Sequence, residues 1–175
     1  MPAWIAILVL AFLPFQAQAD EADKLDGILN YFQITDHIGI AGQPSADQFP
    51  EIARANYTAV INLAMAESSN AVAEEGDIVT SLGMKYIHIP VPWDAPTIDH
   101  LKQFFAVMDE LGDKPVFVHC AANYRASAFV HQYLVLRKGV SSEQATSPIL
   151  RKWLPEMDEN WKPILASTAR DLGID

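Results

Sequence analysis

The stretch Val116-Phe117-Val118-His119-Cys120-Ala121-Ala122-Asn123-Tyr124-Arg125, residues 116–125, decides the fold of this chain. It opens with three apolar residues, which is typical of a short buried strand bounded by turn signals. An apolar helical pattern runs from Arg125 to Lys138 and stops before Gly139. The connection between them is short and consists largely of small residues. The stretch therefore predicts a buried strand, a tight loop and a helix in immediate succession.

Outward from this loop, predicted strands alternate with predicted helices along the chain. Strands are expected over residues 37–41, 58–63, 85–90 and 116–118. Helices are expected over residues 21–32, 45–55, 71–82, 97–111 and 125–138, with further helix in 147–173 that is interrupted at Pro155 and Pro163. Such alternation is typical of layered structures. We therefore expect an α/β fold, a single domain with a mainly parallel central sheet flanked by helices.

The N-terminal segment differs in kind from the rest of the chain. Residues 3–15 are almost wholly apolar and carry no charge, and Ala17 and Ala19 form the small-x-small pattern that signal peptidase accepts. The apolar run is too short to cross a bilayer, which needs about 20 residues. We predict a signal peptide over residues 1–19 that is cleaved after Ala19. The domain of residues 20–175 would then be periplasmic or secreted, without stable membrane insertion.

Charge and cysteine content narrow the function classes. The formal net charge of -10 disfavours nucleic-acid backbones and anionic membranes, so we expect no nucleic-acid partner. Cys120 is the only cysteine, which excludes an intramolecular disulfide. An exported protein with one unpaired thiol must bury it or use it. The histidines lack the spacing of metal ligands, and we expect neither a metal nor a cofactor. The sequence leaves the oligomeric state open.

The loop that begins at Cys120 has the features of an oxyanion site. Successive backbone N–H groups at the N-terminus of a helix bind tetrahedral anions, and the same field favours a thiolate, so we predict that Cys120 is a nucleophile. Arg125 can add a planar, bidentate clamp. Asn123 tolerates the positive φ that a curled loop requires. The predicted anion-binding residues are Ala121, Ala122, Asn123, Tyr124 and Arg125.

The run from His119 to Arg125 resembles the signature loop of the cysteine-dependent protein tyrosine phosphatases. Within that superfamily it is most similar to bacterial dual-specificity-phosphatase-like proteins, which include the phosphatase-like domain described as β-lactamase-hydrolase-like. Residues 40–45 (IAGQPS) and 60–63 (VINL) also resemble that group. The resemblance implies a phosphocysteine formed on Cys120, with the loop amides and Arg125 stabilising the transition state. The implied substrate is a phosphorylated protein, of phosphotyrosine type, or a small-molecule phosphoester.

The resemblance also implies a general acid and supporting residues. Asp94, in the loop of residues 91–96 (VPWDAP), is the predicted acid, and its alternative role is that of an Asx-turn residue before a helix. His119 would orient the loop and favour the thiolate. Ser127 would either hydrogen-bond the departing sulfur or simply lie in the first helical turn. Residues 67–70 lie between a predicted strand and a predicted helix, and we expect either a rim of the pocket or, preferably, a solvated loop.

The spacing of the loop keeps two alternatives open. The phosphatase signature places five residues between cysteine and arginine, whereas four separate Cys120 from Arg125, and Ala126 stands at the usual arginine position. The shorter spacing resembles that of rhodaneses, which suits a sulfurtransferase using a Cys120 persulfide. A phosphate- or sulfate-binding module with decayed catalysis is the second alternative.

Overall fold

The computed structural model describes residues 25–174. The predicted signal peptide and its cleavage site after Ala19 lie outside this range. Over the described range, none of the helices combines the length and the apolar character needed to cross a membrane.

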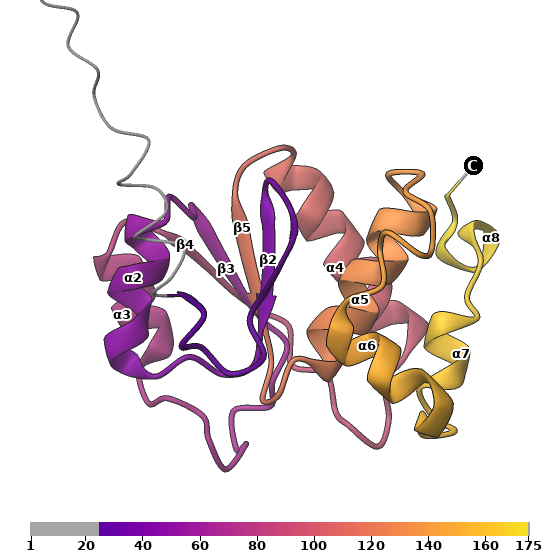
Figure 1. Ribbon diagram of the computed structural model, residues 1–175, viewed down its shortest axis with the longest axis horizontal. Coiled ribbons are helices and arrows are strands. Elements are labelled where there is room, and N and C mark those ends of the chain that lie inside the picture. The colour runs from indigo at the N-terminus through magenta and orange to yellow at the C-terminus, as the bar shows by residue number, and fades with distance from the viewer. Residues whose placement is uncertain (1–24, 175) are drawn as a thin grey trace, which may run out of the picture.

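The described residues form a five-stranded sheet at the centre of the domain (Figure 1). Its strands lie in the order β1-β2-β5-β3-β4, and β1 is antiparallel to β2 whereas the other neighbours pair in parallel. The expected α/β fold with a mainly parallel sheet is therefore confirmed. The strands are β1 (Phe32–Thr35), β2 (Ile38–Ala41), β3 (Ala59–Asn62), β4 (Lys85–His88) and β5 (Val116–His119).

Helices cover both faces of the sheet, as Figure 1 shows. On one face lie α2 (Phe49–Arg54) and α3 (Glu75–Ser81), and on the other lie α4 (Ile98–Leu111) and α5 (Tyr124–Leu136). The C-terminal helices pack beyond α5; they are α6 (Pro148–Trp153), α7 (Lys162–Leu165) and α8 (Ala169–Leu172). Short 3₁₀ turns occupy Ala46–Gln48 and Leu154–Glu156.

The alternation of side chains along the strands produces two separate cores. Val116 and Val118 of β5 belong to the larger core under α4 and α5, whereas Phe117 belongs to the smaller core under α2 and α3. Successive residues of a strand point to opposite faces of a sheet. His119 accordingly packs against Phe49 and Phe117 in the smaller core, while Cys120 lies in the larger one.

The structure corrects two of the expected elements. Leu25 is helical, but residues 26–30 form turns and Phe32–Thr35 is a strand, so the helix expected over residues 21–32 is wrong beyond Leu25. Pairing with β2 decides this segment, and local sequence carries no sign of that partner. The helix expected from Ala71 begins only at Glu75, because Glu74 has a φ of 58°, which a right-handed helix cannot accommodate.

Candidate active site

Cys120 lies at the carboxyl end of β5, directly before the loop that leads into α5. The parallel register aligns Ala41, Asn62 and His119, so three strands end together at this point. The Cys120 side chain is 1% exposed and forms no disulfide. Its N–H donates to the carbonyl oxygen of Ala41 at 3.3 Å. The predicted strand, tight loop and helix are thus all present.

Asn123 gives the loop its curl. It has a φ of 72°, in the left-handed region that asparagine tolerates. Its buried side chain donates from Nδ2 to the carbonyl oxygen of Asn30 at 2.7 Å and accepts at Oδ1 from the Ser127 hydroxyl at 3.1 Å. Ser127 also hydrogen-bonds Ser147, at 2.8 Å between the hydroxyl oxygens, and within residues 25–174 it makes no hydrogen bond with Cys120. In this state Ser127 supports the loop from the first turn of α5.

Groups from distant segments hold the carbonyl oxygens of the loop outward. The Ala121 oxygen accepts from the Gln43 N–H at 3.2 Å and from Asn70 Nδ2 at 2.9 Å. The Ala122 oxygen accepts from Asn30 Nδ2 at 3.1 Å. The N–H groups of these two alanines donate to no acceptor in the described part of the chain. Outward carbonyls and unpaired N–H groups are the arrangement that binds an anion on the inner side of a loop.

Arg125 provides a cation beside these N–H groups. The residue is 7% exposed, and its guanidinium carbon lies 5.5 Å from the centroid of the Trp93 ring. Its buried Nε has no hydrogen-bond partner among residues 25–174. A buried donor without an acceptor is unfavourable, and an oxyanion in the loop would supply that acceptor. The geometry therefore suits Arg125 as an anion clamp.

The loop that carries Asp94 packs against this clamp through Trp93. The Trp93 ring lies near Tyr124, Trp153 and Trp161, with centroids 6.1, 5.3 and 5.2 Å away. Asp94 itself is exposed, and no side-chain hydrogen bond of an Asx turn forms at this residue within the described range. The structure thus brings the predicted acid loop to the signature loop and leaves the carboxyl group available.

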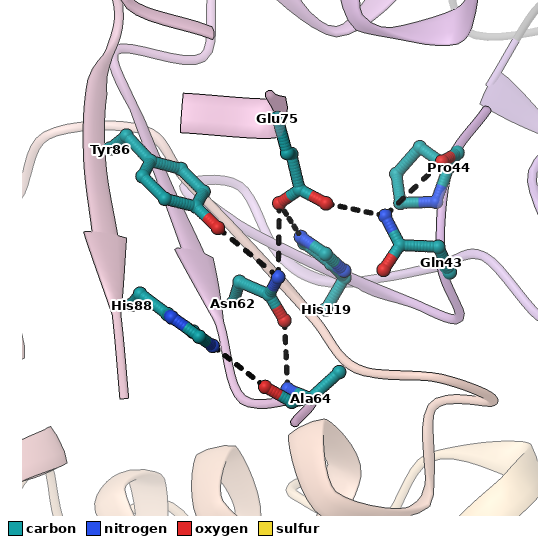
Figure 2. Close-up of polar contacts among 8 residues, drawn as sticks. All are labelled: Gln43, Pro44, Asn62, Ala64, Glu75, Tyr86, His88 and His119. Carbon is teal, nitrogen blue, oxygen red and sulfur yellow. Dashed lines mark hydrogen bonds and ion pairs between the residues drawn. The ribbon is translucent and has the colours of Figure 1, made fainter. Parts of the chain in front are cut away.

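A buried polar network surrounds the His119 side chain (Figure 2). His119 packs in the smaller core and Cys120 in the larger one, so this network lies on the opposite side of the sheet from Cys120. The Glu75 carboxylate accepts from His119 Nε2 at 2.9 Å, from Gln43 Nε2 at 2.6 Å and from Asn62 Nδ2 at 3.1 Å. Burial raises the pKa of Glu75, but the hydrogen bond and charge of His119, aided by Gln43, outweigh it and hold that pKa below its usual value. Glu75 therefore stays ionised. Its carboxylate links His119, the residue before Cys120, to Gln43, whose N–H bonds Ala121, the residue after Cys120.

Sequence reasoning missed Glu75 and the asparagines that hold the loop. Asn70 lies in the segment 67–70, for which the sequence favours a solvated loop over a rim of the pocket, yet its side chain bonds the signature loop 51 residues away. Glu75 carried one usable signal, since it lies four residues before Val79 and therefore on the buried side of its helix. No group of three His, Cys, Asp or Glu residues in the described range is arranged to hold a metal ion.

Comparisons with known proteins give matches that are described as phosphatases. Residues 37–159 match the family described as DSP-PTPase phosphatase fused to NAD+ kinase. A crystal structure of a DUF442 protein from Shewanella putrefaciens, described as a phosphatase, is 34% identical with a TM-score of 0.77, and the match covers 86% of this chain and 97% of that one. No curated protein sequence matches the chain.

Two more distant structures share the fold. Tk-PTP in its active form is 19% identical with a TM-score of 0.62, over 78% of this chain and 93% of that one. The PP-IP phosphatase SIW14 of S. cerevisiae is 14% identical with a TM-score of 0.65, over 82% and 88%.

Proposed function

Because the chain belongs to this family of DSP-PTPase phosphatases, we propose that it hydrolyses phosphoesters through a phosphocysteine intermediate on Cys120. One observation carries the proposal: Cys120 lies at the base of a loop whose carbonyls are tied outward, with the unpartnered Nε of Arg125 beside it. A site of this kind stabilises the charge that develops on a phosphoryl group in the transition state.

In the first step the Cys120 thiolate attacks phosphorus, and a sulfur–phosphorus bond forms as the bond to the leaving oxygen breaks. The loop N–H groups and Arg125 hold the non-bridging oxygens. Asp94 donates a proton to the leaving oxygen. In the second step Asp94 removes a proton from water, the water oxygen attacks phosphorus, and phosphate leaves as the thiolate is restored.

The surroundings of the loop favour an aromatic or other compact phosphoester. Trp93 and Tyr124 are both partly exposed and flank Arg125, so they offer apolar ring surface beside the anion site. Aromatic groups pack well against such surface. Phosphotyrosine in a protein, or a small aryl phosphate, is the substrate class we infer.

The test is turnover of 4-nitrophenyl phosphate by the native chain and by Cys120→Ser, with thiosulfate and cyanide as a second substrate pair. We expect phosphate release that Cys120→Ser abolishes, and a phosphoryl group trapped on Cys120 after acid quenching. Turnover of thiosulfate alone would instead support sulfur transfer, and anion binding without turnover of either would support a binding module. Equal melting temperatures of the two proteins would exclude misfolding as the cause of the loss.

We also propose that residues 1–19 direct export and are removed. Support comes from the apolar run of residues 3–15 followed by the Ala17-x-Ala19 pattern. Mass spectrometry of the protein from its native host should find Asp20 as the first residue. An intact N-terminus, or a cytoplasmic location, would contradict this proposal.

A further inference from the structure

The loop of Asp94 is fastened to the C-terminal segment through a single carbonyl group. The Trp93 oxygen accepts from Asn160 Nδ2 at 2.6 Å and from Trp161 Nε1 at 3.0 Å. A carbonyl oxygen has two lone pairs, so these two donors use both of them. The carbonyl is part of the planar peptide group that joins Trp93 to Asp94. The two donors therefore fix the orientation of the backbone from which the Asp94 carboxyl group extends.

The Trp93 side chain and main chain are held by different parts of the molecule. Its ring packs between the Arg125 guanidinium and the indoles of Trp153 and Trp161. Its carbonyl is held by the segment that follows α6. Loss of the Asn160 bond would thus remove one of the two restraints on the peptide plane, while the Trp161 N–H and the aromatic packing still kept the loop in place. The role of Asn160 can therefore be tested separately from the folding of the loop.

We propose that Asn160, helped by the Trp161 indole, is a positioning residue for the general acid. It holds the peptide group before Asp94 so that the carboxyl group meets the leaving oxygen above Cys120. The inference rests on the proposed role of Asp94. Asn160 is half-buried at the surface, and it follows directly on the stretch of residues 37–159 that the family match covers. Its removal leaves the cradle of the signature loop untouched.

The experiment compares kcat/KM for phenyl phosphate, whose leaving oxygen needs a proton, with that for 4-nitrophenyl phosphate, whose leaving group needs little help. We expect Asn160→Ala to lower kcat/KM for phenyl phosphate by about 3- to 10-fold, the effect of one hydrogen bond, and to change the nitrophenyl ester by less than about 2-fold. Glu159→Ala is the matched control, because that exposed side chain is paired with Lys162. It should leave both esters unchanged.

Asp94→Asn and the double variant Asp94→Asn with Asn160→Ala separate the two proposals. If Asn160 acts through Asp94, the double variant equals Asp94→Asn alone. An Asp94→Asn variant that slows both esters equally would remove the acid role of Asp94, and the positioning role with it. The positioning role alone would be overturned if Asp94→Asn slows mainly phenyl phosphate but Asn160→Ala affects both esters equally or neither. It would also be overturned if the double variant is slower than Asp94→Asn alone. Trp161→Phe, which keeps an aromatic ring and loses the N–H, repeats the test if Asn160→Ala unfolds.

Discussion

Replacing Glu75 by glutamine should destabilise the protein by about 3 kcal/mol at neutral pH. The Glu75 side chain is 4% exposed and accepts three N–H donors, one of them from buried His119. Hydrogen bonds to a charged group are worth about 1.5–3 kcal/mol each, so removing the charge that accepts all three costs about 3–5 kcal/mol. The lower end applies here, because Gln43 Oε1 has no partner in the described range and its amide can turn to accept from the new side chain. About 3 kcal/mol corresponds to a melting temperature about 6–12 °C lower in a domain of this size.

The direction of the Glu75 pKa shift determines how the cost of Glu75→Gln changes with pH. Because the pKa of Glu75 is lowered on folding, its contribution to the free energy of unfolding is complete above its ordinary pKa of 4.5 and is lost as the pH falls through the folded value. The difference between the native chain and Glu75→Gln should therefore be largest near neutral pH and shrink as the pH falls below 4.5 toward the lowered pKa of the folded state. Urea unfolding followed by tryptophan fluorescence measures both free energies.

Glu74→Gln is the matched control for this measurement, because the Glu74 side chain is exposed and is not among the partners of Glu75 in the described residues. It should change the free energy of unfolding by less than about 0.5 kcal/mol. The reasoning is refuted if Glu75→Gln costs less than about 1 kcal/mol at neutral pH, or if its cost is the same in acid.

Three further substitutions probe the signature loop. Arg125→Lys should lower kcat/KM for an aryl phosphate by about 10- to 100-fold in steady-state assays, because a lysine cannot clamp two oxygens at once; a loss below threefold would contradict the clamp. Asn123→Ala should lower the free energy of unfolding by about 1 kcal/mol more than Asn123→Gly, because both lose the side-chain bonds and only alanine is strained at a φ of 72°. Equal midpoints in urea unfolding would argue against that strain. Asn70→Ala should weaken inorganic phosphate binding by about 3- to 10-fold in calorimetry, because the Ala121 carbonyl loses a donor; unchanged affinity would show that Gln43 alone holds it.

The fold was predictable where its signals are local. The apolar run 116–118, the small residues after it and the apolar helix that follows lie within one short stretch, and the structure has the strand, loop and helix there. The order of the strands was not predictable, because β5 lies between β2 and β3 only through pairings far apart in sequence. The strand at residues 32–35 was not predictable for the same reason, since a four-residue strand at the sheet edge depends on pairing with its partner strand.

The candidate site, like the fold, was predictable only where its residues are close together in the sequence. The sequence places Cys120, Asn123 and Arg125 together because they are neighbours, and the geometry suits the roles predicted for them. The groups that hold the loop in shape come from elsewhere: Asn30 and Glu75 reach it from 92 and 44 residues away. A polar residue in a loop and a charge on a helix have many ordinary uses, so neither reveals its partner before the chain is folded.

The division of the sheet into two cores has a consequence for engineering the protein. His119 and Cys120 are adjacent in the chain, yet their side chains lie in different cores. Trp93 and Tyr124, which flank Arg125, pack against the core that contains Cys120, so a mutant library confined to the side chains that bond Glu75 leaves both unaltered. Such a library would act on the loop from behind, through His119 and Gln43, and not through the aromatic side chains beside the anion site. Ordinary strand geometry thus separates the side chains that support the loop from those that line it, on the two sides of a single backbone.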